Sequence, residues 1–337
     1  MKVLVIRFSS IGDLTQALSI PSLIKTYKPE AEIHFVTRQD LSMLTKNNPN
    51  IDRVWTLDRH NGIRGLLKLI SELRKENFTH LYDAHNNLRS LIMRTLLFVP
   101  KTVVRPMMRI KRFLLIRFHK NLFEKPFSGQ RDLLKPLEKW GFKFFLPPAP
   151  QLFLSTGARN YAENILNQHQ IKNPIVLAPS ASFALKRWPL EYWHELIRKF
   201  PDQKFIVLAG PSDTFTAELS IYPNVLDLTG KTDLDQSAAI IEKAILVISN
   251  DTGLLHFAEQ LGRPAIAFMG PAPFGFPSRP STQILERPLY CRPCSKHGQG
   301  PCINPNFHEC LRSISPDEVA AKVLVQIKLI NVANLPL

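Results

Sequence analysis

The residues from Ile245 to Gly262 have the types and spacing of an anion-binding site. The apolar run 245–248 is strand-like, and Asp251 or Thr252 follows at the N-cap position of a helix. Gly253 lets the backbone approach a ligand at this point. Free N–H groups at a helix start carry partial positive charge and bind phosphate or pyrophosphate. The segment therefore predicts the capture of a phosphorylated ligand.

One residue of this segment, His256, has two interpretations. It lies one turn inside the expected helix, where it can bond a phosphate oxygen or cap the helix. The whole pattern also has a purely structural alternative, an ordinary strand–helix junction with a capping aspartate. Motifs elsewhere in the chain favour ligand binding.

A second group of polar residues follows an apolar strand run at residues 3–6. Ser9, Ser10, Gly12 and Asp13 are expected in the loop at the carboxyl end of this strand. Open α/β sheets bind ligands in the loops at the carboxyl ends of their strands, so we expect a site at this loop. Asp13 can act there as a catalytic base or as a helix cap. The loop carries neither the dinucleotide fingerprint G-x-G-x-x-G nor a Walker motif.

Four motifs are informative through their order and spacing: 6–13 (Ile-Arg-Phe-Ser-Ser-Ile-Gly-Asp), 179–189 (Pro-Ser-Ala-Ser-Phe-Ala-Leu-Lys-Arg-Trp-Pro), 209–211 (Ala-Gly-Pro) and 249–256 (Ser-Asn-Asp-Thr-Gly-Leu-Leu-His). Together they resemble the motifs of glycosyltransferase family 9, the ADP-heptose:lipopolysaccharide heptosyltransferases. The resemblance covers nearly the whole chain and extends to segments 291–294 and 310–316. The chain departs from the family at Ala209, where Gly is usual, at Thr252, where Ser is common, and at 83–87, where Asp-x-Gln is commoner. These departures leave the subfamily and the acceptor open.

The resemblance implies the GT-B fold, an α/β arrangement of two Rossmann-like domains that face each other across a cleft. It implies an inverting, metal-independent enzyme that transfers heptose from ADP-heptose to the inner core of lipopolysaccharide. Asp13 matches the family's catalytic carboxylate. Lys186 matches the lysine that contacts the donor diphosphate.

The remaining site residues divide between the two substrates. Donor contacts are expected from Asp251, Thr252, Gly253 and His256, with Asp213 as a candidate for the donor ribose; acceptor contacts are expected from Ser9, Ser10 and Gly12. The helix start at Thr252 and Gly253, together with Lys186, can take the place of a divalent ion. We therefore expect no catalytic metal and no cofactor.

Two other functions remain open. A GT-B transferase that uses another nucleotide sugar would carry the same motifs. A non-catalytic protein that binds sugar nucleotides or polyanions would keep the phosphate loop and show no turnover. A panel of nucleotide sugars separates the three.

Strands alternate with helices in both halves, which indicates parallel sheets. Strands are expected at 3–6, 33–36, 53–57, 80–83, 175–178, 204–209, 246–248 and 265–268, and helices near 63–76, 87–98, 156–169, 189–200, 212–221, 234–244, 253–261 and 316–330. The length of 337 residues also favours two domains. We expect an acceptor domain at 1–155, a nucleotide-sugar domain at 156–315 and, at 316–337, a C-terminal helix that can pack back on the first domain.

The net charge of +15 suggests a polyanionic partner. Residues 84–123 contain no acidic residue and nine basic ones, with apolar residues interleaved. Such a segment suits contact with an anionic membrane or with phosphorylated sugars. Its alternative is a solvated helix face beside a core stripe. Nucleic acid is not an expected partner, because no recognition helix, aromatic RNA-binding strand or basic tail accompanies the charge.

Four cysteines lie close together in a loop rich in Gly and Pro: Cys291, Cys294, Cys302 and Cys310. The first pair has zinc-ligand spacing and the others can complete a tetrahedral site, while four free thiols are the alternative. His297 and His308 are further candidate ligands. A cytoplasmic location is expected, with peripheral contact at the inner membrane, because the sequence contains neither a secretory segment nor an apolar stretch of membrane-spanning length.

Overall fold

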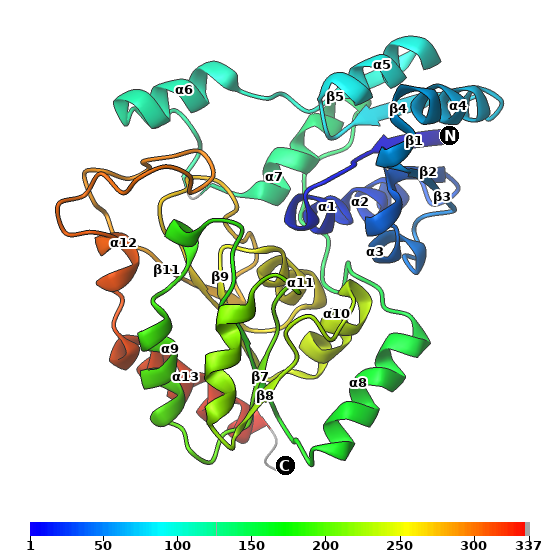
Figure 1. Ribbon diagram of the computed structural model, residues 1–337. Helices are drawn as coiled ribbons and strands as arrows, with labels where there is room; N and C mark the ends of the chain where they lie inside the picture. The colour runs from blue at the N-terminus through cyan, green and yellow to red at the C-terminus, as the bar shows by residue number, and fades with distance from the viewer. Residues whose placement is uncertain (126, 334–337) are drawn as a thin grey trace. The chain divides into compact units, whose positions relative to one another are not determined.

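The computed structural model describes residues 1–125 and 127–333, with side chains up to 329. The chain forms two compact units (Figure 1). The first unit comprises residues 1–109 and 128–153, and the second comprises 110–127 and the chain from 154 onward. The expected boundary after residue 155 lies close to this division. The segment 110–127 groups with the second unit, whereas the sequence suggested the first.

The first unit is built on a five-stranded parallel sheet of order β3-β2-β1-β4-β5. Its strands are β1 (Lys2–Ile6), β2 (Glu32–Arg38), β3 (Arg53–Leu57), β4 (His80–Asp83) and β5 (Lys101–Val104). The central strand β1 is almost fully buried, as expected for an apolar run in a parallel sheet. Leu4 of β1 lies opposite His34 of β2 and Leu81 of β4.

Helices cover this sheet. They are α1 (Ile11–Ala17), α2 (Ser19–Tyr27), α3 (Met43–Lys46), α4 (Gly62–Arg74), α5 (Leu88–Leu97) and α7 (Gly129–Leu134), with 3-10 turns at Gln39–Leu41, Arg59–Asn61 and Lys135–Trp140. In α4, Leu66, Leu69, Ile70 and Leu73 follow helical spacing and join the core beside β1. The helical segment after β1 breaks between α1 and α2, just before Pro21, whose nitrogen cannot donate a hydrogen bond.

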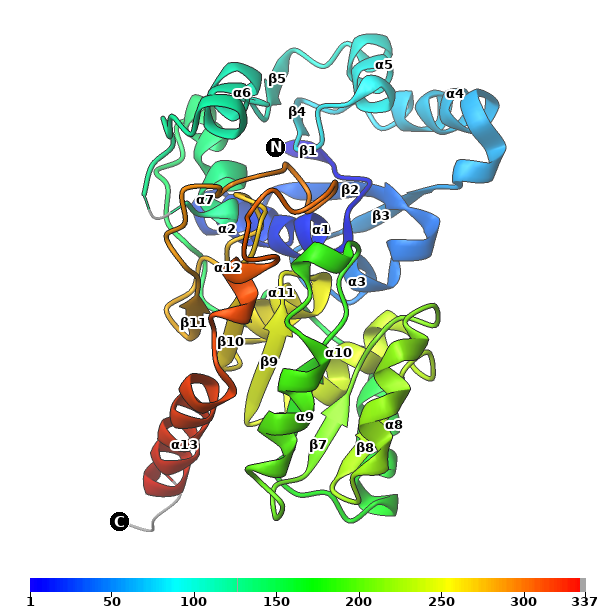
Figure 2. The same cartoon turned by 60° about the vertical axis from the view of Figure 1, so that its left-hand side comes forward.

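The second unit contains a six-stranded parallel sheet of order β11-β10-β9-β6-β7-β8 (Figure 2). Its strands are β6 (Ile175–Ala178), β7 (Phe205–Val207), β8 (Val225–Asp227), β9 (Leu246–Asn250), β10 (Ala265–Phe268) and β11 (Thr282–Leu285). The four strands expected from the sequence are present. The edge strands β8 and β11 and, in the first unit, β5 were not expected.

The helices of the second unit are α6 (Arg109–Phe118), which begins at the last residue of the first unit, α8 (Thr156–Gln168), α9 (Leu190–Arg198), α10 (Leu234–Lys243), α11 (Gly253–Leu261), α12 (Glu309–Arg312) and α13 (Pro316–Ala333), with 3-10 turns at Ala184–Lys186 and Thr214–Ile221. The segment expected as a helix near 212–221 is therefore a 3-10 turn. Within the described residues, no helix combines the length and apolarity that a membrane crossing requires.

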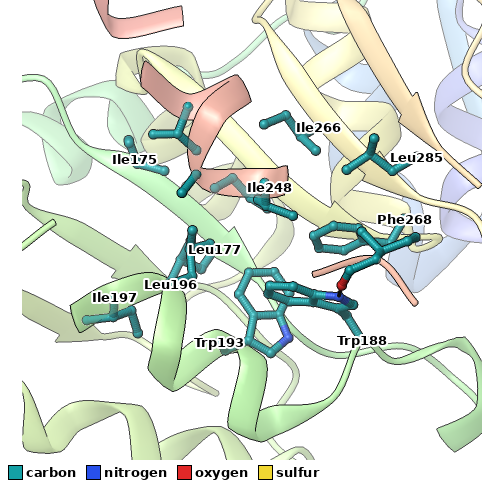
Figure 3. Close-up of a cluster of buried hydrophobic side chains, with 14 of the residues drawn as sticks. Ile175, Leu177, Trp188, Trp193, Leu196, Ile197, Ile248, Ile266, Phe268 and Leu285 are labelled. Carbon is teal, nitrogen blue, oxygen red and sulfur yellow. Dashed lines mark hydrogen bonds between the residues drawn. The ribbon is translucent and has the colours of Figure 1, made fainter. Parts of the chain in front are cut away.

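The core of the second unit gathers around two tryptophans (Figure 3). The Trp188 ring stacks on Phe268 with 4.6 Å between ring centroids, and Trp193 meets both rings edge to face. Helix α13 contributes to this core through Val319, Ala320 and Val323 and packs against α9. Helix α13 therefore belongs to the second unit, and its expected packing on the first unit remains a prediction. Residues 334–337 of the expected C-terminal segment lie outside the described residues.

Candidate active site

Asp13 lies in the first turn of α1, directly after the carboxyl end of β1. Ser10 occupies the N-cap position, so Asp13 is the third residue of the helix and not its N-cap. The Asp13 carboxylate accepts a hydrogen bond of 2.9 Å from the Ser10 hydroxyl, and its Oδ2 lies 2.7 Å from Nη2 of Arg7. The side chain keeps 41% of its surface exposed. An oriented carboxylate with an open side can accept a proton from a ligand.

The ion-pair partner of this carboxylate, Arg7, is buried in the first unit. Its side chain is only 5% exposed, and Nη1 donates a 2.6 Å hydrogen bond to the carbonyl of Ala84, after β4. Burial lowers the pKa of Arg7, and the nearby charge of Asp13 raises it. Because one guanidinium is tied to two strand ends, the position of the Asp13 carboxylate is set by the sheet.

A second arginine approaches from β5. Arg105 Nη1 lies 4.0 Å from Oδ1 of Asp13, while Nε donates a 2.8 Å hydrogen bond to Asp132. Burial lowers the pKa of Arg105, but the charges of Asp132 and Asp13 outweigh it, so the net shift is upward. The Asp13 carboxylate thus faces two cationic side chains.

A neutral histidine completes the surroundings of Asp13. Burial, with a smaller contribution from Arg7, lowers the pKa of His85 to about 4. Its ring meets Phe8 edge to face, with centroids 5.4 Å apart. At neutral pH this imidazole is uncharged, so it adds no third positive charge to the site.

The expected acceptor residues lie beside Asp13 in the chain: Ser9 and Ser10 precede α1, and Gly12 is in its first turn. Ser10 is exposed, and Ser9 and Gly12 are partly exposed. Their roles remain predictions. Sequence analysis missed Arg7, His85, Arg105 and Asp132 as members of this site. A charged residue directly after a buried strand was a usable signal for Arg7, and His85 lies in the 83–87 motif, whereas Arg105 and Asp132 carried no local signal.

Lys186 lies in the second unit, at the end of a 3-10 turn after β6. Its Nζ is 2.6 Å from Oδ2 of Asp251, and the two side chains are 16% and 7% exposed. Asp251 directly follows β9, which neighbours β6 in the sheet. The fold therefore brings the expected diphosphate-binding lysine to the phosphate loop.

Trp188 anchors the segment that carries Lys186. Its backbone N–H donates 2.9 Å to the Asn250 side chain, and its indole N–H donates 2.9 Å to the carbonyl of Ile314. The ring is buried in the core shown in Figure 3. A residue fixed in the core two positions away limits the freedom of the lysine backbone.

Helix α11 begins where sequence predicted. Thr252 is the N-cap in extended conformation, its side chain makes no capping hydrogen bond, and Gly253 is the first helical residue. Gly275 approaches the same loop at φ +108°, where an added Cβ would stand 2.6 Å from an Asp251 oxygen. Only glycine fits this close approach. The first turn of α11 thus presents backbone N–H groups beside the lysine, as anion binding requires.

Two expected donor residues have structural partners. His256 is buried, and its Nδ1 lies 3.2 Å from Glu259, which also accepts backbone N–H groups of Ser278 and Arg279. These contacts connect α11 to the loop before β11. His256 remains a prediction as a phosphate contact.

Asp213 also has partners inside the second unit. Its carboxylate accepts the Gly210 N–H at 3.1 Å and lies 3.3 Å from Arg187, whose guanidinium stacks 4.5 Å from the Phe215 ring centroid. Asp213 therefore holds Arg187, the neighbour of Lys186 in the chain. Its expected contact with a ribose remains a prediction.

Comparison with known proteins identifies the family to which this chain belongs. Residues 66–301 match Glycosyltransferase family 9 (heptosyltransferase). The lipopolysaccharide heptosyltransferase 2 of Escherichia coli is 25% identical over 304 residues, covering 81% of this chain and 83% of that protein.

Two solved structures share the fold. A family 9 glycosyl transferase from Veillonella parvula aligns with a TM-score of 0.81 at 22% identity and covers 97% of both chains. The E. coli heptosyltransferase WaaC with ADP-2-deoxy-2-fluoro heptose aligns with a TM-score of 0.71 at 17% identity, over 97% of this chain and all of WaaC.

Two parallel sheets of Rossmann type, matched over 97% of the chain by these two structures, define the GT-B fold. The chain belongs to glycosyltransferase family 9, the heptosyltransferase family of lipopolysaccharide biosynthesis.

Proposed function

We propose that this enzyme transfers heptose from ADP-heptose to the inner core of lipopolysaccharide, with inversion at the anomeric carbon and without a catalytic metal ion. Support for the donor comes from family membership and from WaaC, whose structure carries an ADP-heptose analogue. Support for the acceptor comes from the related lipopolysaccharide heptosyltransferase. The observation that carries the mechanism is the half-exposed Asp13 carboxylate held by buried Arg7.

Asp13 serves as the general base. It accepts the proton of an acceptor hydroxyl while that oxygen attacks the anomeric carbon from the face opposite the diphosphate. The new glycosidic bond forms as the bond to the phosphate oxygen breaks. A single displacement of this kind inverts the configuration. The charges of Arg7 and Arg105 favour the ionised carboxylate that the step requires.

The second unit stabilises the departing diphosphate. Lys186 supplies a full positive charge, and the first turn of α11 at Gly253 supplies backbone N–H groups. Asp251 keeps the ammonium beside that helix start. Fixed donors of this kind can stabilise developing negative charge without a divalent ion.

A donor panel tests the proposed reaction. The full-length enzyme is incubated with a heptose-deficient lipopolysaccharide acceptor and several nucleotide sugars, and nucleoside diphosphate release is measured with the anomeric configuration of the product. We expect the highest kcat/KM with ADP-heptose, and inversion. Preference for another donor contradicts the substrate assignment, retention contradicts the mechanism, and absence of turnover with every donor indicates a binding protein.

A chelation experiment tests the metal-free step. Activity should survive EDTA in protein that remains folded by circular dichroism, because the positive field comes from the protein. Activity that is lost in folded protein and restored by Mg²⁺ or Mn²⁺ contradicts this step.

The basic segment around α6 suits the proposed membrane contact. Its exposed apolar side chains are Met108, Ile110, Phe113, Phe118 and Leu122. Exposed basic residues, among them Arg109, Arg117 and Lys120, lie between them. Apolar side chains that insert among headgroups, flanked by cations, favour an anionic interface. At such a surface the enzyme would meet its lipid-linked acceptor, in line with the cytoplasmic, membrane-peripheral location predicted from the sequence.

Vesicle sedimentation tests this contact. Binding to vesicles with phosphatidylglycerol should exceed binding to phosphatidylcholine vesicles and decline with salt. An Ile110→Ser/Phe113→Ser variant should lose most of it, whereas Ile221→Ser, another exposed isoleucine, should not. Equal binding of the double variant and the parent protein would reject α6 as the contact.

A further inference from the structure

Four cysteines line one small cavity, three from the loop between β11 and α12 and one from α12 itself. We name Cys291, Cys294, Cys302 and Cys310 the cysteine cluster. The cavity is also lined by Leu185, Arg292 and His308. None of the four thiols is in a disulfide. Cysteines from an irregular loop and from the helix after it thus converge on a common space.

Two sulfurs of the cluster accept hydrogen bonds from neighbouring groups. Cys291 and Cys310 are buried, and the other two are partly buried. The His308 N–H donates to Sγ of Cys302 at 3.3 Å, and the Asn304 amide donates to Sγ of Cys291 at 3.4 Å. Such hydrogen bonds orient sulfur ligands and offset part of their negative charge.

The spacing within the cluster matches metal coordination. Cys291 and Cys294 form a C-x-x-C pair, and Cys302 and Cys310 supply a second pair. Among the described residues, the four sulfurs of the cluster are too far apart for any three of them to lie within 4.8 Å of one another. Tetrahedral Zn²⁺ with Zn–S bonds of about 2.3 Å places its sulfurs about 3.8 Å apart. Metal binding would therefore contract this loop around its cavity.

A rival cation site in the first unit is less suitable. Glu32, His34 and Glu76 offer ligand atoms close together. The Lys2 ammonium already lies 3.0 Å from Glu32 and 2.7 Å from Glu76. Arg53 lies 2.6 Å from Glu76, so two cations balance the two carboxylates and the group is an ion-pair network that needs no metal.

We propose that the cysteine cluster binds one Zn²⁺ ion as four thiolates and that this ion stabilises the loop behind Lys186. Binding releases four protons and involves no oxidation. The resulting site carries two negative charges. Arg292, whose Nε donates to the Gly270 carbonyl at 2.7 Å, lines the same cavity and can offset part of that charge.

The loop touches the segment that carries the lysine. His308 Nε2 lies 2.9 Å from the Leu185 carbonyl oxygen. Gly298, at φ +83°, lies against the aliphatic chain of Lys186, where an added Cβ would stand 2.5 Å from Cγ. A metal that orders this loop therefore orders Lys186. This consequence for catalysis rests on the proposed function, whereas the metal site itself does not.

Metal analysis of the full-length protein tests the site. Protein purified without chelator should contain about one zinc per chain by mass spectrometry, and Cys291→Ser/Cys294→Ser should contain less than a tenth of that. A Glu32→Gln/Glu76→Gln control, which changes the rival group, should keep its zinc. Zinc-free wild-type protein that also fails to bind added Zn²⁺ overturns the proposal, as does zinc retained in the cysteine variant. One iron in place of zinc overturns the choice of metal and keeps the site.

A second measurement uses only the wild-type protein, so it remains informative if the cysteine variants do not fold. Co²⁺ added to metal-depleted wild-type protein should produce the intense visible bands of tetrahedral thiolate coordination, and equimolar Zn²⁺ should bleach them. Absence of these bands, or four thiols that titrate freely in zinc-saturated protein, contradicts the site. Full turnover without bound metal contradicts only the link to Lys186, and zinc in a protein without transferase activity contradicts only the proposed function.

Discussion

The two units use opposite arrangements of charge at the carboxyl ends of their sheets. In the first unit the buried partner is a cation, Arg7, and the more exposed group is the carboxylate of Asp13. In the second unit the buried partner is a carboxylate, Asp251, and the more exposed group is the ammonium of Lys186. In both, the less exposed ion follows a central strand and orients the more exposed group. The same type of sheet edge thus presents an oriented carboxylate in one unit and an oriented ammonium in the other, which matches the proton transfer and anion binding proposed for them.

Removal of the proposed base, Asp13, should lower turnover more than any other change considered. Asp13→Asn keeps the size of the side chain and an oxygen for Arg7 but cannot accept the proton, so kcat should fall by roughly 10²-fold or more. Steady-state kinetics checks this, with thermal unfolding as the control for folding. Asp52→Asn is a matched variant, because Asp52 is 40% exposed and paired to Lys25 before β3. Near-normal turnover of a folded Asp13→Asn enzyme would leave Asp13 a structural role only.

Removal of the lysine should have the next largest effect. Lys186→Ala removes a cation from the departing diphosphate, and kcat/KM for the donor should fall roughly 10- to 100-fold while acceptor KM hardly changes. Lys243→Ala is the matched control, since Lys243 pairs with Glu163 on the surface. A variant that loses acceptor affinity and keeps its donor kinetics would remove the nucleotide sugar from the second unit.

Removal of the charge of Asp251, the buried partner of Lys186, should lower donor kcat/KM less than removal of the lysine. Asp251→Asn leaves Lys186 charged but without its 2.6 Å ion pair, so the ammonium becomes less well oriented. Donor kcat/KM should fall by roughly 5-fold, equivalent to about 1 kcal/mol. Donor titrations check this. A decrease as large as that of Lys186→Ala would mean that Asp251 itself contacts the donor.

A prediction about stability, and not about activity, concerns the pH dependence of the first unit. Burial lowers the pKa of His85 to about 4, below its value of about 6.5 in the unfolded chain. Between these values the unfolded state binds more protons, so stability decreases as pH falls from 6.5 toward 4. Urea unfolding at pH 7.5 and 4.5 should show that His85→Gln loses about 2 kcal/mol less than the wild type. Equal losses would mean that His85 is not protected from protonation in the folded state.

The central elements of both sheets could be predicted because their local signal is strong. Runs such as 3–6, 175–178 and 265–268 are buried on both faces, so every residue is apolar. The edge strands β5, β8 and β11 have mixed burial and mixed composition. An edge strand is stabilised by its neighbour in the sheet, which a single sequence does not reveal.

The site residues also divide into those that the sequence predicted and those that only the structure revealed. Asp13, Lys186 and the helix start at Thr252 were predicted from motifs and local spacing, and the structure brings Lys186 to that helix start. Their partners were found only in the fold. Arg105 reaches Asp13 from a strand far along the chain, and the sequence between them contains no periodic signal of that contact.

The sequence by itself determined the chemical groups, the central strands of both sheets and the family resemblance. Tertiary structure decided which groups meet. Strand β9 lies beside β6 in the sheet, although α9, β7, β8 and α10 separate them in the chain, and this adjacency places Asp251 2.6 Å from Lys186. The sheet order also makes Arg7 a buried anchor and leaves Asp13 open to solvent. Burial and ion pairing depend on distances through space, and those distances exist only after the strands have assembled.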